Sequence, residues 1–169
     1  MIRLAFQALQ AWLKEIEKIV DVEWYNQQDL DLPETPLKMT PRLYLEFNDV
    51  PTSTMGQGLQ SFDMTFLVRL VTEHYTEDID VENHYLLSDQ VYTKLQGARL
   101  WMSHIPKYAI FKDTDSDQVL LNSISRTRII PDHSHTQLMV SAQQFSCKAL
   151  DVAALLTYLE KDVSLQVEC

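Results

Sequence analysis

The strongest candidate for a reactive centre in this sequence is a short segment that contains Asp132, His133 and His135. Two imidazoles and a carboxylate are ligands that zinc accepts. Histidines spaced i, i+2 converge on one ion only on a strand or in a special turn, and the sequence marks no further ligand. Because the segment lies between two predicted strands, where polar residues are common, we interpret it as a solvated hairpin turn.

Three aspartates with alternate spacing suggest a second ion site. Asp113, Asp115 and Asp117 are spaced like the first ligands of a calcium-binding loop. That loop also needs a glycine at its sixth position and a glutamate at its twelfth, and those places hold Gln118 and Ile124. The pattern therefore favours a solvated acidic turn.

Two arginines, Arg126 and Arg128, stand two residues apart on a predicted strand, which places them on one face. A carboxylate or a partner protein could meet them there. We favour an ion pair, within the chain or between subunits, over a site for a small anion.

Catalytic patterns are missing from the rest of the sequence. No serine is framed by the glycines of a nucleophile elbow, and Gly56-Gln57-Gly58 does not match a phosphate-binding loop. Glu77 and Asp78 are paired carboxylates, but they lie in an acidic run without an apolar neighbour that would raise a pKa. The sequence thus predicts no enzyme activity, no cofactor and no metal site.

Composition and charge narrow the class of protein. The 169 residues, 46% hydrophobic and 22% charged, fit a single domain over 1–169 that can bury a core without a disulfide. A net charge of −10 argues against binding nucleic acid by its phosphates and against an anionic membrane surface. The two cysteines, Cys147 and Cys169, lack metal-site spacing, and no signal peptide or membrane span is evident, so we expect a cytoplasmic site of synthesis.

Hydrophobic periodicity predicts an α+β fold with a largely antiparallel sheet, packed by an N-terminal helix and a central helix. The residues 48–57 are predicted to form a polar loop, and Asp80 is predicted to cap the central helix. The final residues, 161–169, are expected to form a flexible end or a strand. The predicted helices cover 2–20, 80–96 and 152–160, a short helix running into a strand covers 98–111, and the strands cover 22–28, 42–47, 58–74, 119–130 and 136–149.

The longest predicted strand, 58–74, has two different faces. Alternate residues from Phe62 to Leu70 are apolar and are expected to face the core, against a helix stripe that includes Leu9, Trp12 and Ile16. The opposite face is polar near Asp63 and apolar near Val71. We therefore expect that face to be covered along only part of its length.

The order of these elements resembles the tail-terminator, or tail-completion, proteins of long-tailed bacteriophages and prophages, a group that includes minor tail and neck proteins. An N-terminal helix leads into VEWYNQQ, and a proline-spaced loop precedes RLYLEF. A polar loop, the long strand in MGQGLQSFDMTFLVRLV, an acidic linker and a helix follow, and a late strand pair ends in QQFSCKALD. The resemblance spans the chain without a diagnostic motif.

The resemblance implies a non-enzymatic virion protein. Such proteins assemble in the host bacterial cytoplasm as a homohexameric ring that caps the tail tube, ends its polymerisation and joins the tail to the head and neck. DNA would pass through the ring without specific binding, and like charges on the wall would favour sliding. The expected subunit or partner contacts are Pro51, Thr52, Ser53, Thr54, Met55, Arg126 and Arg128, and the expected channel-lining residues are Glu73, Glu77, Asp78, Asp80 and Glu82.

Two other classes of function stay open at this stage. An acidic binding module, such as a head-closure protein, an adaptor or an inhibitor, would be acidic because its partner is basic. An enzyme would use the turn with His133 and His135. The oligomeric state separates the ring from an inhibitor, and a metal analysis tests the enzyme.

Overall fold

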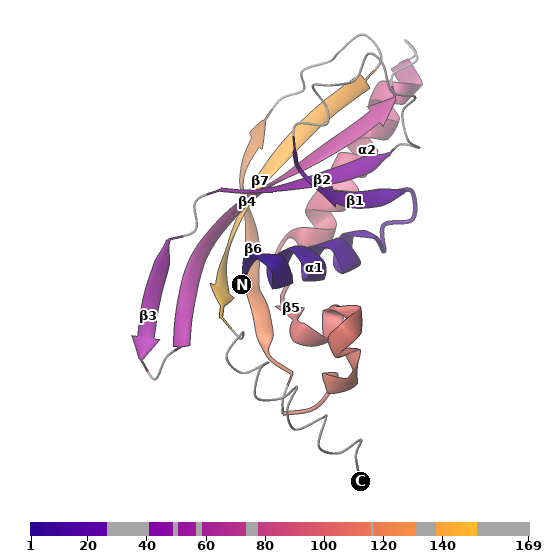
Figure 1. Ribbon diagram of the computed structural model, residues 1–169. Coiled ribbons are helices and arrows are strands. Elements are labelled where there is room, and N and C mark those ends of the chain that lie inside the picture. The colour runs from indigo at the N-terminus through magenta and orange to yellow at the C-terminus, as the bar shows by residue number, and fades with distance from the viewer. Residues whose placement is uncertain are drawn as a thin grey trace.

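The computed structural model describes residues 1–26, 41–48, 51–56, 59–73, 78–115, 117–130 and 138–151. Within these ranges, seven strands form one sheet, two α-helices pack with it, and two 3₁₀ helices follow a short strand (Figure 1). This is the predicted α+β class. The elements are α1 (Ile2–Leu13), β1 (Asp21–Trp24), β2 (Arg42–Phe47), β3 (Thr52–Gly56), β4 (Leu59–Glu73), α2 (Asp78–Leu95), β5 (Leu100–Trp101), η1 (Met102–His104), η2 (Pro106–Phe111), β6 (Val119–Ile130) and β7 (Leu138–Leu150).

The strand order is β1-β2-β4-β7-β6-β5, and β3 pairs with β4 outside this path. Every pairing is antiparallel except that of β1 with β2, so the sheet is largely antiparallel as predicted. Strands β2 and β3 lie end to end along one edge of β4, because Phe47 pairs with Phe66 and Thr52 with Phe62.

The polar loop predicted over 48–57 is wrong for half of its length, because Thr52–Gly56 forms β3. Its Thr-Ser-Thr sequence is short and polar, but threonine is β-branched and favours extended backbone. Gly56 pairs with Leu59, which makes β3 and β4 a tight hairpin.

The helix-facing side of β4 is the centre of the core. Phe62, Met64, Phe66, Val68 and Leu70 are all buried, which confirms the predicted orientation. Leu9 of α1 and Ile16, which follows that helix, belong to the same buried cluster, and Trp12 packs against it. The alternation of apolar residues in β4 is therefore a sound guide to its buried face.

An aromatic row crosses this face from α1 to the centre of the sheet. The ring centroids of Phe6 and Trp24 lie 5.3 Å apart, those of Trp24 and Phe47 5.1 Å, and those of Phe47 and Phe66 5.9 Å. Phe66 and Phe145 end the row with stacked rings 5.7 Å apart. The row connects the four adjacent strands β1, β2, β4 and β7 through side-chain packing.

The opposite face of β4 changes character along its length, as predicted. Asp63 is exposed, whereas Leu67 and Val71 are buried. Val71 belongs to a second apolar cluster with Tyr44 of β2 and Leu138 and Val140 of β7. One half of this face is therefore covered and the other half is open.

Both helices differ from their predicted limits. The first helix ends at Leu13, and Ile16 and Ile19 are buried in the turns that follow it. The second begins at Asp78, so Asp80 lies inside the helix and is not its N-cap. Its buried side carries His84, Leu87, Val91 and Leu95, whereas Tyr85 is 52% exposed.

The segment 98–111 does not have the predicted order of a helix running into a strand. The order is reversed: β5 comes first, and the 3₁₀ helices η1 and η2 follow it. Pro106 begins η2, because proline lacks the N–H that would continue a regular helical pattern. The predicted C-terminal helix at 152–160 and the end at 161–169 lie outside the described residues.

The reactivity of the Cys147 thiol in β7 provides a test of the described core. The side chain is 7% exposed, and desolvation raises the pKa of its thiol from 9.0 to about 12. The reactive thiolate at pH 8 is then about a thousandfold scarcer than for an ordinary thiol. In a Cys169→Ser variant we expect almost no alkylation by iodoacetamide in native buffer and full alkylation in denaturant, measured by intact mass. Rapid native modification would contradict the burial of Cys147.

Candidate interaction surfaces

The outer edge of β1 is closed by the first helix. The side-chain amide of Gln10 donates to the carbonyl of Val22 at 2.6 Å, and the Asp21 carboxylate accepts the Val22 N–H at 2.8 Å. Lys14 lies 2.7 Å from the same carboxylate, and its hydrogen bond holds the pKa of Asp21 below its ordinary value. These contacts occupy both backbone groups of Val22, which an added strand would otherwise pair with.

The outer edge of β6 is covered at one end and, among the described residues, unpaired at the other. Its first half pairs with β5, and Ile124 exchanges backbone hydrogen bonds with Gly97 and Ala98. The N–H of Arg126 donates to the Gln96 side chain at 3.0 Å. Beyond that point, Thr127–Ile130 pairs only with β7 among the described residues.

Arg126 and Arg128 do not share a face, contrary to the sequence prediction. Arg126 pairs with Phe145 and Arg128 with Gln144, so a β-bulge between them puts the two side chains on opposite sides. The Arg126 guanidinium lies 3.7 Å from the centre of the Tyr92 ring and donates to Gln143 at 3.2 Å. Arg128 is exposed and has no ion-pair partner in the part of the chain that the structure describes.

The predicted contact residues Pro51, Thr52, Ser53, Thr54 and Met55 fall in and beside β3. Pro51 is exposed, and β3 pairs with β4 alone among the described strands. Figure 1 shows β3 and the adjoining end of β4 extending away from both helices. The structure thus gives this segment the form of a projecting edge strand.

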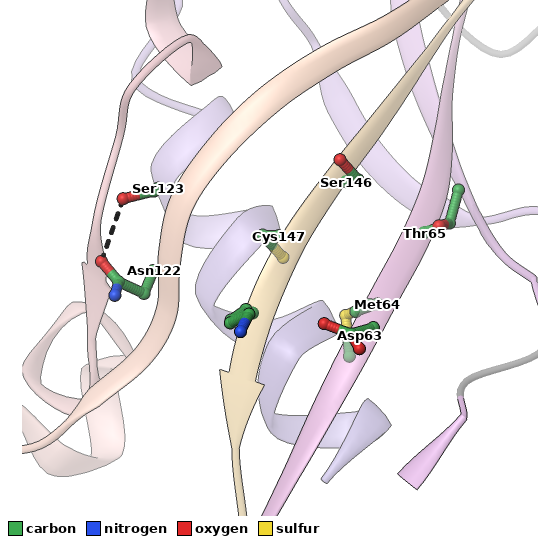
Figure 2. Close-up of a pocket in the computed structure, with 8 residues that line it drawn as sticks. Asp63, Met64, Thr65, Asn122, Ser123, Ser146 and Cys147 are labelled. Atoms are coloured by element: carbon green, nitrogen blue, oxygen red, sulfur yellow. Dashed lines mark hydrogen bonds between the residues drawn. The ribbon is translucent and has the colours of Figure 1, made fainter. Parts of the chain in front are cut away.

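An open groove lined by both polar and apolar atoms lies on the uncovered half of the sheet, between β4, β7 and β6 (Figure 2). Its volume is about 400 Å³. Asp63 and Lys148 face each other across β4 and β7, and Ser123 donates to Asn122 at 3.2 Å. Ser123 has a φ of 53°, a left-handed conformation that is costly for a residue other than glycine, and it sits in a second bulge of β6. Mixed charges and hydroxyls suit hydrogen bonds to a polar partner surface.

The predicted channel acids occupy the start of α2 and the end of β4. Asp78, Asp80 and Glu82 lie in the first turns of α2, where carboxylates stabilise the helix dipole. Glu73 and Asp80 are half-buried and line one small cavity with Lys18 and His84. Glu82 is exposed, and Glu77 lies outside the described residues. The acidic residues at the start of α2 therefore have a local role in the helix, in addition to any role in a channel.

A buried histidine was missed by the sequence reasoning. His84 is fully buried, and its Nδ1 lies 2.8 Å from Thr72 Oγ1 while its Nε2 lies 2.7 Å from Ser141 Oγ. A serine hydroxyl beside an imidazole is also the pair used by many nucleophilic enzymes. Here Ser141 is 7% exposed beneath α2, so we interpret the pair as an attachment of that helix to β4 and β7. The steps of three and four residues between His84, Leu87 and Val91 could have indicated from the sequence that these side chains share the buried side of α2.

Of the two candidate ion sites, the one with Asp113, Asp115 and Asp117 lies within the described residues. The Asp117 carboxylate accepts hydrogen bonds from the backbone N–H and hydroxyl of Ser103, at 3.0 and 2.6 Å. Asp113 and Asp115 are exposed, and within the described ranges no three acidic, histidine or cysteine side chains gather as a metal site would require. The segment with Asp132, His133 and His135 lies outside the described residues.

Comparison with known proteins gives little guidance. No protein-family model matches the chain, and no curated protein matches it. Among the solved structures that match, a chain of the "Virion of native gene transfer agent (GTA) particle" is similar over 76% of this protein and 78% of that chain. The sequence identity is 10% and the TM-score is 0.44, which is too low to define a shared fold or role. In the described residues, no helix is long and apolar enough to cross a membrane.

Proposed function

We propose that this protein is a structural component of a phage-like virion that forms a ring at the end of the tail tube, ends tail polymerisation and joins the tail to the head. The order of elements in the sequence motivates the tail-terminator assignment. A hexamer is the favoured ring, and the virion tail or neck is the favoured location. The tube protein and a head–neck protein would be its partners.

The observation that carries this proposal is the asymmetry of the sheet edges. Gln10 and Asp21 close the edge at β1, while β3 and the end of β6 pair on one side only among the described strands. Unpaired edges promote association unless something covers them. A rotational ring needs two different contact surfaces on each subunit, and the β3–β4 hairpin and the β6 end supply separate candidates.

Acidic charge fits the passage of DNA through such a ring. With a net charge of −10, a channel wall would repel the phosphates over roughly a Debye length, about 8–10 Å. Among the candidate wall residues whose side chains the structure describes, Glu82 is exposed, whereas Glu73 and Asp80 are half-buried. The same charge would keep a monomer soluble, so the oligomeric state decides between the two interpretations.

Light scattering coupled to size exclusion tests the proposal directly. We expect a discrete particle with six times the mass of the 19.6 kDa chain, and electron microscopy should show a pore about 20 Å or more across, wide enough for a duplex. Duplex DNA should not be retained at low salt. A monomer at high protein concentration, or a pore lined by arginine and lysine, would contradict the ring.

A further inference from the structure

Two stretches of strand edge on opposite sides of the sheet have room for a further strand. Among the described strands, β3 pairs with β4 alone, and Thr127–Ile130 of β6 pairs with β7 alone. Thr52–Gly56 contains no charged residue and no proline, and Thr127–Ile130 contains one charge, at Arg128. Both stretches therefore lack most of the devices by which proteins protect an edge from association.

The other described edges are less suitable for strand addition. In β1, both backbone groups of Val22 are already bonded to side chains. The strand β5 is two residues long, and the Trp101 N–H donates to His104 Nδ1. Leu138–Ser141 of β7 lies one strand further in than the end of β6, so an added strand would have to pass that end to reach it. Of the described edges, β3 and the end of β6 are thus the longest that a partner strand can reach.

The pairing of β3 with β4 shows which backbone groups of β3 face outward. The Asp63 N–H donates to the carbonyl of Pro51 at 3.3 Å. Pairs that exchange hydrogen bonds alternate along an antiparallel ladder, so the N–H and C=O of Ser53 also face β4. The corresponding groups of Thr52 and Thr54 face away from β4, toward the position of an added strand.

The directions of the two strands suit a head-to-tail joint between identical copies. The strand β3 is antiparallel to β4, whereas β6 runs in the same direction as β4, because β4 and β6 are both antiparallel to β7. If the sheet of one copy continues into the sheet of the next, β3 therefore meets the end of β6 in the antiparallel direction. Two different edges are used at each joint, as a rotational ring requires.

The register of the two edges is compatible with a closed ring. On β4, β3 lies level with Ser61 and the end of β6 lies level with Leu67, which is an offset of about 20 Å along the strand. The four strands β3, β4, β7 and β6 span about 19 Å across the sheet. Copies joined with this offset have strands inclined by about 45° to the ring axis, close to the roughly 35–45° of closed barrels.

We propose that β3 of one copy pairs antiparallel with Thr127–Ile130 of the next copy, so that the sheets of neighbouring subunits are continuous. This contact rests on the proposed ring and assigns its subunit interface to two strand edges. The partner at each edge is a second copy of this chain.

The register also predicts which residues meet across the joint. Thr52 pairs with Phe62, so Thr52 and Thr54 belong to the side of the sheet that faces the helices. Ile129 pairs with Gln143, whose side-chain amide donates to a carbonyl of α2, so Ile129 belongs to the same side. Because faces are preserved across a continuous sheet, Ile129 of one copy lies opposite one of these two threonines of its neighbour.

Disulfide cross-linking in a Cys169→Ser background tests this pairing. Thr52→Cys and Thr54→Cys are each mixed with Ile129→Cys before assembly and then oxidised. Facing positions on paired strands have Cβ atoms about 4.5–5.5 Å apart, so at least one mixture should give a covalent dimer on a non-reducing gel, whereas each variant alone should not. Ser53→Cys lies on the opposite side of the sheet and should not cross-link with Ile129→Cys, which makes it the matched control.

A proline in β3 tests the contribution of the backbone. Thr54→Pro removes an outward N–H and leaves the ladder with β4 in place, whereas Thr54→Val keeps the N–H. The proline variant should need at least about tenfold more protein to assemble, because it loses a hydrogen bond at each interface and its ring obstructs the neighbouring strand. The valine variant should assemble like the wild type, and circular dichroism verifies that both are folded.

The possible results separate this contact from the proposed function. A monomeric wild-type protein contradicts both. A wild-type ring without a cross-link from either threonine position, or with normal assembly of Thr54→Pro, leaves the ring standing and overturns the contact. A dimer formed by Thr54→Cys alone indicates that β3 pairs with itself, which also overturns it. Cross-links confined to the mixtures support the contact, and their occurrence in an open filament would contradict only the ring.

Discussion

Replacing Phe66 with alanine is expected to lower the free energy of unfolding by about 3–5 kcal/mol. The side chain is fully buried in the middle of β4, between Phe47 on one side and Phe145 on the other. Truncation removes the apolar contacts of a whole ring and leaves a cavity that the two neighbouring strands cannot fill without distortion. Urea denaturation of purified protein, with the slope of the transition compared between variants, measures the loss.

A graded series makes the Phe66 result interpretable. Phe66→Leu keeps much of the volume and should lose less, on the order of 1–2 kcal/mol. Tyr85→Ala removes a ring that is 52% exposed and should change stability much less than Phe66→Ala. If Phe66→Ala unfolds at the same urea concentration as the wild type, β4 does not face the core as described.

The strands were predictable wherever one face of the sheet is buried and the alternation is regular. RLYLEF and VLLNSISRTRII have the predicted limits, because β-branched and aromatic residues within each run favour extended backbone. The bulges in β6 were not predictable, since a bulge inserts one residue into a pairing that only the partner strand defines. That single residue separates Arg126 from Arg128 and changes which side each arginine faces.

The projecting β3 hairpin shows why a polar segment can be misread as a loop. Its stability depends on pairing with β4, whose long apolar face fixes the position of the strand. Nothing in Thr-Ser-Thr-Met alone distinguishes an edge strand from an extended loop.

The buried side of α2 is partly polar. His84 is fully buried on it, whereas the adjacent Tyr85 is 52% exposed. A second polar attachment lies one turn further on, where the Gln143 side-chain amide donates to the Ser88 carbonyl at 2.7 Å and lies 2.8 Å from the Ser88 hydroxyl. Leu87, Val91 and Leu95 supply the apolar part of the same contact. The helix is therefore positioned by specific hydrogen bonds as well as by apolar burial.

Replacing His84 with leucine is expected to destabilise the protein by about 2–6 kcal/mol, because it leaves two buried hydroxyls without their imidazole partner, at about 1–3 kcal/mol each. Thr72 and Ser141 are each 7% exposed, so water reaches their oxygens poorly. In the neutral ring one nitrogen donates and the other accepts, and each hydroxyl can take either role. The histidine thus satisfies one hydroxyl from each of the two central strands, β4 and β7.

The physical reason for this loss is tested by removing the two hydroxyls together with the imidazole. The triple variant His84→Leu, Thr72→Val, Ser141→Ala lacks both hydroxyls, so it should recover most of that loss and be more stable than His84→Leu alone by about 2–6 kcal/mol. Glu82→Ala, an exposed change two residues away on the same helix, should stay within about 0.5 kcal/mol of the wild type. Thermal and urea unfolding of these four proteins give the comparison. A triple variant less stable than the single one would mean that the hydroxyls have other strong partners, and that lost packing around His84, not stranded polar groups, destabilises α2.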